Sequence, residues 1–295
     1  MKILVMGSGG VGGFYGGRLA NTGCDVTFVA RGAHLAAMRE NGLTIESPAH
    51  GDIHIPRVKV CEDPASAGVV DLVLIAVKLW DTESAARAVK PAVGPHTAVL
   101  SLQNGVIKDV ILRKELGASC LMGGVAYVGT TIARPGVIRQ TGLLQRLLFG
   151  EYDGKRSARA VALLEALLAA GIQAELSEDI RRTLWEKYVF LVGLSGSTST
   201  MRVPIGPIRE NPQTRAFLLE LMKETVEVGR AHGVDLPEDY AAQRLDFADS
   251  VAPDMTSSLY HDLERGNPLE VEWLSGGVVQ LGEAVGVPTP ANRAV

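Results

Sequence analysis

The sequence predicts an α/β fold in which a doubly wound parallel sheet is followed by an all-helical second domain. Short apolar runs typical of buried strands alternate with stretches of helical periodicity up to residue 176, which indicates a parallel sheet with helices on both faces. After residue 177 only the helical pattern continues, interrupted by Pro and Gly loops. We therefore expect an N-terminal domain over residues 1–177 and a helical domain over residues 178–295.

The elements follow one another in a regular order. The first is a short strand at 3–6, followed by a cluster of glycines and a helix that ends near Gly23. The further strands of the alternating part are expected at 25–31, 71–78, 97–102 and 172–176, and its further helices at 33–41, 82–93, 106–116 and 157–171. Residues 119–150 are rich in strand patterns, in three pieces.

Residues 43–60 break this alternation. They read as two short extended pieces around a Pro and Gly turn, which we expect to form an excursion at the edge of the sheet. In the second domain, the helical pattern begins with the segment EDIRRTLWEKYVFLVGL at residues 178–194.

Composition excludes several classes of protein. The chain has 295 residues, of which 46% are hydrophobic and 21% charged, with a formal net charge of −4, values ordinary for a globular protein with a small-molecule ligand. There is no basic block for nucleic acid, no polybasic membrane anchor, no signal-peptide core and no long apolar segment. We expect a cytoplasmic protein. The cysteines Cys24, Cys61 and Cys120 are widely spaced, so we expect reduced, half-buried thiols and no metal site.

The glycine cluster carries the clearest functional motif. Gly7, Gly9 and Gly12 form the pattern G-x-G-x-x-G, with Gly10 and Val11 between the last two. The pattern follows a strand and opens a helix, which is the context of a dinucleotide site. In such a site the first glycine allows a tight turn, the second admits the pyrophosphate, and the third lets the helix pack on the strand. The alternative is a merely tight strand-to-helix turn.

The identity of the dinucleotide depends on the end of the second strand. An acidic residue there would hold a ribose 2′-hydroxyl, but Asp25 lies at the start of that strand and Arg31 at its end. Because a guanidinium suits a 2′-phosphate, NADP(H) is favoured over NAD(H). A solvated loop arginine is the alternative.

Three further polar residues are candidates for a ligand site. Lys78 and Asn104 follow predicted strands, whose carboxyl ends collect ligands in such sheets. A surface lysine and a helix N-cap are the alternatives. Lys187 is flanked by apolar residues. Burial lowers the pKa of a lysine and helps it deliver a proton, although a lysine whose ammonium reaches solvent would give the same pattern.

Residues near the C-terminus are less informative by pattern alone. Glu270 and Glu272 lie near the start of a predicted helix, where the helix dipole alone explains acidic residues. Ser257 and Ser258 precede another helix and would serve as its cap.

Taken together, these motifs resemble the ketopantoate reductase family. The matching segments, in order, are GSGGVG at 7–12, Arg31, AVK at 76–78, QNG at 103–105, WEK at 185–187, SSL at 257–259 and EVEWLSG at 270–276. The resemblance covers both domains and implies a Rossmann domain followed by a helical domain of the 6-phosphogluconate dehydrogenase type. It further implies NADPH-dependent reduction of a 2-oxo acid, in this family 2-dehydropantoate to pantoate in pantothenate biosynthesis.

The resemblance also implies roles for individual residues. Lys187 would be the general acid, Glu270 would hold the new hydroxyl and Ser258 would help to bind the carboxylate. Asn104 and Lys78 would lie beside the nicotinamide and the substrate. These roles suit the chemistry, because hydride addition to a ketone builds negative charge on its oxygen.

Three positions depart from the family pattern. Leu191 and Ser195 stand where the family has asparagines on the helix of the catalytic lysine, and Ile205 stands where an asparagine normally precedes the glycine. Ser195 stays a candidate substrate residue. The lost amides leave open a different 2-oxo acid or an imine as substrate, and a non-catalytic NADPH sensor is a further alternative. Apolar helices in the second domain are compatible with a homodimer and equally with an internal core.

Overall fold

The computed structural model describes all residues, 1–295, as two compact units. The first comprises residues 1–103 and 108–180, and the second residues 104–107 and 181–295. The division of the chain at Ile180 and Arg181 lies near the expected boundary at residue 177. The four residues 104–107, which the sequence places in the first domain, group with the helical unit instead.

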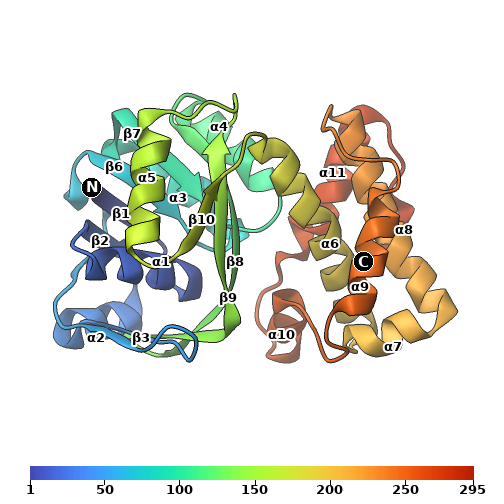
Figure 1. The fold of residues 1–295 in the computed structure, drawn as a ribbon, viewed down its shortest axis with the longest axis horizontal. Helices are drawn as coiled ribbons and strands as arrows, with labels where there is room; N and C mark the ends of the chain where they lie inside the picture. The colour runs from blue at the N-terminus through green and yellow to red at the C-terminus, as the bar shows by residue number, and fades with distance from the viewer. The chain divides into compact units, whose positions relative to one another are not determined.

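The first unit is built on one ten-stranded sheet (Figure 1). Its order is β4-β3-β9-β8-β7-β6-β1-β2-β5, with β10 paired to β9. The strands are β1 (Lys2–Met6), β2 (Asp25–Val29), β3 (Leu43–Glu46), β4 (Ile53–Ile55), β5 (Lys59–Cys61), β6 (Val70–Ile75), β7 (Val93–Ser101), β8 (Leu121–Arg134), β9 (Val137–Glu151) and β10 (Gln173–Leu176). The helices of this unit are α1 (Gly10–Asn21), α2 (Gly32–Asn41), α3 (Thr82–Val89), α4 (Ile107–Leu116) and α5 (Ala158–Ala169), with 3-10 helices η1 (Pro64–Ala67), η2 (Leu79–Asp81) and η3 (Lys90–Ala92).

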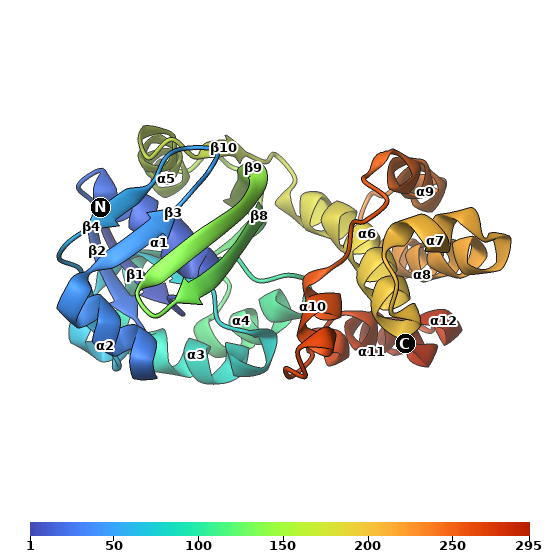
Figure 2. The same ribbon diagram turned by 90° about the horizontal axis from the view of Figure 1, so that it is seen from below.

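Helices cover both faces of this sheet, as the sequence predicts (Figure 2). One core joins α1, α2 and α5 to the alternate strand residues Ile3 and Val5. The other core joins α3 and α4 to the intervening residues Leu4 and Met6. A strand buried on both faces in this way reads as a continuous apolar run, which explains the pattern of β1 and β6.

The sheet departs from the prediction in two places. Neighbouring strands are parallel except for the antiparallel pairs β3–β4 and β8–β9. Residues 43–60 were expected as two pieces at one edge, but they form three strands. β3 and β4 pair at one edge, whereas β5 pairs with β2 at the other.

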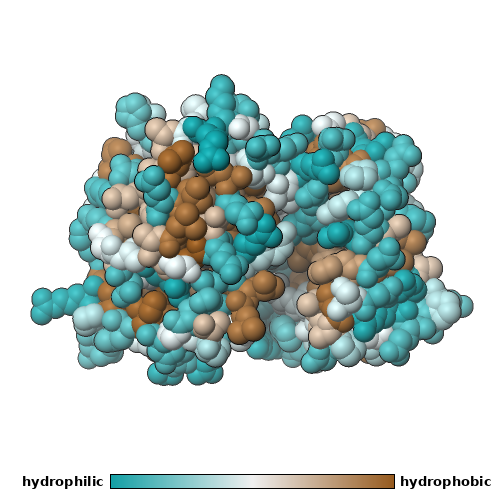
Figure 3. Space-filling view, viewed as in Figure 1, coloured by the Kyte–Doolittle hydropathy of each residue, from teal (hydrophilic) through white to brown (hydrophobic).

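A bulge explains why β9 looked like two strands in the sequence. Thr141 pairs with Gly129 and Gln145 with Val128, so residues 142–144 have no partners in the ladder. Two leucines in this bulge, Leu143 and Leu144, are 77% and 65% exposed. Figure 3 shows several groups of hydrophobic residues on an otherwise largely hydrophilic surface.

The second unit is helical, as predicted from the loss of strand patterns after residue 177. Its elements are α6 (Ile180–Met201), α7 (Ile205–Glu210), α8 (Pro212–Ala231), α9 (Tyr240–Ser250), α10 (Ser258–Glu264), η4 (Glu270–Glu272), α11 (Ser275–Val285) and α12 (Pro290–Ala294). None of the helices in either unit combines the length and the apolar character needed to cross a membrane. The cysteines are free, but Cys120 is buried rather than half-buried.

Candidate active site

The glycines of the turn between β1 and α1 differ in how much space a side chain would have. Gly7 has φ +98°, and a Cβ there would lie 2.8 Å from the backbone nitrogen of Val77. A Cβ on Gly12 would lie 2.1 Å from the carbonyl oxygen of Gly7. A Cβ on Gly9 would meet no atom within 4 Å. Gly7 and Gly12 are therefore required by the turn itself, whereas the absence of a side chain at Gly9 leaves its backbone accessible.

The N-terminus of α1 has the properties of an anion site. Its N-cap, Gly9, offers no side-chain cap, and the first turn carries no acidic residue. The N–H groups of Gly10, Val11 and Gly12 begin the helix, where they add to the positive end of the helix dipole. The hydroxyl of Thr130 on β8 is buried without a hydrogen-bond partner, and a Cβ on Gly10 would lie 3.0 Å from it. An unused donor beside free amides fits a dinucleotide phosphate.

The end of β2 carries a cation and no acid. Arg31 is the exposed N-cap of α2, two residues after the end of this strand. Asp25 lies at the other end of β2 and forms an ion pair with Lys59 at 2.7 Å. The hydrogen bond from Lys59 is the main reason why the pKa of Asp25 is lowered. Asp25 lies at the wrong end of the strand, as the sequence indicated, and it is also paired with Lys59.

The loop after β6 brings Lys78 to the carboxyl edge of the sheet. Lys78 is the exposed N-cap of η2, and its Nζ lies 5.8 Å from the ring centre of Trp80. The buried Gln103 fixes this loop, because its Nε2 donates to the carbonyl of Val77 at 3.0 Å and to the hydroxyl of Thr82 at 2.8 Å. The QNG motif thus holds the loop that follows β6 in place.

In the second unit, Lys187 of α6 meets Asn104. The half-buried lysine donates from Nζ to Oδ1 of Asn104 over 2.9 Å. α4 begins at Ile107, so the alternative of Asn104 as a helix N-cap is wrong. The neighbouring Tyr188 donates its hydroxyl to the carbonyl of Leu274 at 2.6 Å. α6 is thereby tied to the segment that directly follows η4.

Glu270 and Glu272 lie close to the start of a helix, as the sequence predicts. Glu270 and Glu272 lie on η4, and α11 begins only at Ser275. The two carboxylates therefore form a short turn of their own just ahead of α11. Because Tyr188 holds the segment after η4, the fold fixes this turn relative to α6.

The two serines before α10 have different roles. Ser257 is the N-cap, and its Oγ accepts from the backbone N–H of Tyr260 at 3.1 Å. It also lies 3.3 Å from the hydroxyl of Thr198 on α6. Capping is therefore confirmed for Ser257. Ser258, the exposed first residue of α10, does not form this cap.

The face of α6 that carries Lys187 continues through Leu191, Ser195 and Thr198, since residues three or four apart share a helix face. Ser195 is buried, and its hydroxyl points back to the carbonyl of Val192 at 3.5 Å, within its own helix. Thr198 likewise donates to Leu194 at 2.6 Å. The serine and threonine hydroxyls of this face are thus directed toward α6 carbonyls.

Sequence reasoning missed two residues near the glycine turn. Thr130 looked like an ordinary strand residue, and only the packing of β8 against α1 brings its hydroxyl to Gly10. His34 on α2 contacts the carbonyl of Ser8 at 2.9 Å. Neither has a local pattern that could have identified it.

Two family models match this chain. One, described as "Ketopantoate reductase PanE/ApbA", covers residues 3–154. The other, "Ketopantoate reductase PanE/ApbA C terminal", covers residues 179–295. The chain belongs to the ketopantoate reductase family. It is an oxidoreductase, and the resemblance drawn from the sequence is confirmed.

Individual relatives agree with this assignment. A 2-dehydropantoate 2-reductase of Mesorhizobium japonicum is 31% identical over 316 residues, which cover 100% of this chain and 95% of the relative. A PanE/ApbA family ketopantoate reductase from Ralstonia eutropha has 36% identity and a TM-score of 0.89, covering 100% of this chain and 95% of the other. D-mandelate dehydrogenase, solved with NADH and anilino(oxo)acetate, shares the fold at 19% identity with a TM-score of 0.87, covering 99% and 95% of the two chains.

Proposed function

We propose that this member of the ketopantoate reductase family reduces a 2-oxo acid to a 2-hydroxy acid with NADPH, and that its substrate is 2-dehydropantoate. The observation that carries the proposal is the half-buried ammonium of Lys187, which donates to Asn104 at 2.9 Å. A cation oriented by a neutral amide can stabilise an oxygen on which negative charge develops. Relatives named 2-dehydropantoate 2-reductase support the choice of substrate.

In this proposal each residue has a defined task. The chemistry that reduced nicotinamide supplies, when bound, is hydride transfer to the ketone carbon. Lys187 gives a proton from Nζ to the ketone oxygen, and the amide oxygen of Asn104 keeps the ammonium in position. Glu270 accepts a hydrogen bond from the new hydroxyl. Ser258 helps to bind the substrate carboxylate, and Lys78 lies beside the nicotinamide and the substrate.

The proposed cofactor site uses the glycine turn. The N–H groups of Gly10, Val11 and Gly12 would hold the pyrophosphate beside Gly9. Arg31 would pair with the 2′-phosphate that distinguishes NADPH from NADH. The exposed position of Arg31 two residues after the end of β2 supports this preference.

A less polar 2-oxo acid is the second candidate substrate. Leu191 is apolar, the Ser195 hydroxyl faces its own helix, and Ile205 is fully buried with its N–H bonded to the carbonyl of Met255. None of the three supplies the amide that the family pattern leads us to expect. A site without these amides has fewer groups that hydrogen-bond a substrate hydroxyl, so it distinguishes a hydroxylated 2-oxo acid only weakly from one that lacks the hydroxyl.

The proposal is tested by following NADPH oxidation with wild type and with Lys187→Ala. We expect kcat for 2-dehydropantoate to fall about 10²- to 10⁴-fold in the variant, because the proton donor is lost. The Kd for NADPH should stay unchanged. The control is Lys223→Ala on α8, a lysine that pairs only with the exposed Glu220 in the interactions described. It should behave as wild type.

Three results would contradict the proposal in different ways. Wild-type turnover in Lys187→Ala removes this residue from the mechanism. A higher kcat/KM for 3,3-dimethyl-2-oxobutanoate than for 2-dehydropantoate favours the less polar substrate, since the two acids differ only in one hydroxyl. NADPH binding without turnover of any 2-oxo acid indicates the non-catalytic sensor.

A further inference from the structure

We propose that His34 is a positioning residue for the dinucleotide: its neutral ring bridges the glycine turn to the β8–β9 turn, and its protonation weakens cofactor binding. The inference rests on the proposed function, because it assumes that the glycine turn binds NADPH. His34 lies outside the glycine motif, and it is not part of the Lys187–Asn104 pair.

The bridge consists of two hydrogen bonds on opposite sides of one ring. Nε2 of His34 lies 2.9 Å from the carbonyl oxygen of Ser8, the residue between Gly7 and Gly9. Nδ1 lies 3.0 Å from the backbone nitrogen of Gly136, in the turn between β8 and β9. The half-buried imidazole thereby joins two loops that are separated by more than a hundred residues of sequence.

The partners of the ring determine its protonation state. A backbone N–H can only donate, so Nδ1 must accept from Gly136 and carry no proton. A carbonyl oxygen can only accept, so Nε2 must carry the proton that it donates to Ser8. A second proton on Nδ1 would face the N–H of Gly136, and the bridge would lose that bond. Only the neutral form of His34 satisfies both contacts.

Both ends of the bridge are held firmly by other bonds. The N–H and the hydroxyl of Ser8 both donate to the carbonyl of Val29, at 3.1 and 2.9 Å. The carbonyl of Gly136 accepts from the N–H of Thr44 at 3.0 Å. Since Ser8 is fixed on one side by β2 and on the other by His34, a change at the ring acts directly on the turn that presents the amides of α1.

Burial favours the neutral ring. Burial lowers the pKa of His34, and its hydrogen bond to Ser8 opposes this by a smaller amount. The glycine turn carries no charged residue. α2 carries Arg39 and Glu40, with Arg31 at its N-cap. Arg134 of β8 and Arg139 of β9 both pair with Glu46 of β3. The other charged residues of β9, Arg146 and Glu151, pair with Glu175 and Arg159.

The sign of the pH effect follows from this lowered pKa. The bridge is complete above the ordinary histidine pKa of about 6.5. It is lost as the pH falls through the lower pKa of the folded protein. NADPH affinity should therefore fall on the acid side, at the pH where His34 itself becomes protonated.

The test measures the Kd for NADPH by titration calorimetry from about pH 8 to about pH 4.5 for wild type, His34→Ala and His34→Gln. Glutamine has an amide NH2 group that donates and a carbonyl oxygen that accepts, and it does not titrate in this range, so it can keep the bridge at every pH. We expect His34→Ala to weaken binding about tenfold at pH 8, equal to about 1.4 kcal/mol. His34→Gln should bind like wild type at pH 8 and lose the acid-side dependence. The control is His96→Gln, an exposed histidine on β7.

Two readouts separate positioning from a general structural effect. kcat at saturating NADPH should stay unchanged in His34→Ala, and the amides of residues 7–13 should exchange with deuterium faster in this variant without cofactor. The pKa of His34, measured by NMR in the protein alone, should match the pH at which wild-type binding weakens. Equal affinity of wild type and His34→Ala, or the same pH dependence in wild type and His34→Gln, overturns the inference. If wild type does not bind NADPH at all, the proposed function itself fails.

Discussion

Gly9 and Gly12 belong to one motif but face different constraints, and substitution by alanine separates them. In Gly12→Ala the new Cβ would collide with the carbonyl of Gly7, 2.1 Å away, so the free energy of unfolding should fall by about 3 kcal/mol. In Gly9→Ala no atom lies within 4 Å of the new Cβ. Stability should change by no more than about 1 kcal/mol, the size of an N-cap effect, while NADPH binding weakens. Urea denaturation and calorimetry measure the two quantities.

The matched pair makes this residue-scale prediction specific. Gly9 has φ −68°, which alanine adopts without strain, so a folding defect in Gly9→Ala would contradict the packing described here. Unchanged NADPH affinity in the same variant would contradict the assignment of the backbone of Gly9 to the pyrophosphate. The motif indicated both glycines from the sequence, and the structure shows that only a side chain at Gly12 would meet another atom.

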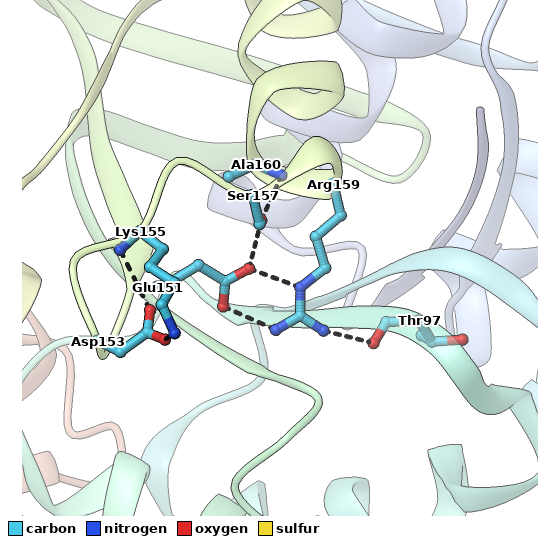
Figure 4. A network of polar contacts seen from close by, with 7 residues as sticks. All are labelled: Thr97, Glu151, Asp153, Lys155, Ser157, Arg159 and Ala160. Atoms are coloured by element: carbon cyan, nitrogen blue, oxygen red, sulfur yellow. Dashed lines mark hydrogen bonds and ion pairs between the residues drawn. The ribbon is translucent and has the colours of Figure 1, made fainter.

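At the element scale, one carboxylate joins the end of β9 to the start of α5 (Figure 4). Glu151 accepts from Arg159 through two bonds of 2.7 Å and from the Ser157 hydroxyl at 2.6 Å. Arg159 also donates to the carbonyl of Thr97 on β7 at 3.4 Å. This largely buried group fixes α5 against the sheet.

Replacing this carboxylate should destabilise the fold in a pH-dependent manner. Burial opposes ionisation of Glu151, but the hydrogen bonds from Arg159 and Ser157 outweigh it, and its pKa lies below the ordinary value. Its contribution is therefore present above about pH 4.5 and is lost as the pH falls through the lower pKa of the folded state. Glu151→Gln should lower the free energy of unfolding by about 2 kcal/mol at pH 7, and by much less in acid.

An exposed ion pair in the same loop gives the control for this prediction. Asp153 and Lys155 pair at 2.7 Å, with side chains 55% and 78% exposed. Asp153→Asn should therefore change stability by less than about 0.5 kcal/mol. A stability difference between wild type and Glu151→Gln that is the same at pH 7 and at low pH would show that the charge of Glu151 is not responsible.

For the strands and helices, the pattern of apolar residues predicts some features of the fold and not others. The alternation of strands and helices was predictable because the spacing of apolar residues within each segment indicates which of its faces are buried. The antiparallel course of β9 and the separation of β3 from β5 were not, because strand direction and order depend on partners far away in the sequence. The extra residues 142–144 interrupt the ladder and mimic a strand end.

At the scale of the whole molecule, cofactor binding should appear as stability of the folded chain. A ligand at 100 times its Kd adds about 2.7 kcal/mol to the free energy of unfolding. We expect NADPH to raise Tm more than the same concentration of NADH, because Arg31 pairs with the 2′-phosphate. In Arg31→Ala the two cofactors should give similar shifts. Thermal unfolding followed by circular dichroism measures the effect.

Arg39→Ala provides the comparison for this substitution, since Arg39 is an exposed arginine near the other end of α2. It should keep the preference for NADPH. An equal Tm shift by NADH and NADPH in wild type would contradict the proposed NADPH preference while leaving the glycine turn as a dinucleotide site.

The α/β class, the glycine turn, the helical second unit and the family were predictable from the sequence, because these depend on local periodicity and on motifs of a few adjacent residues. The folded chain was needed to show that Oδ1 of Asn104 accepts a hydrogen bond from the ammonium of Lys187, 83 positions away. It was also needed to show that Thr130 and His34 reach the glycine turn. Such contacts form when distant segments pack together, and the residues next to a side chain in the sequence do not indicate which distant partner it will contact.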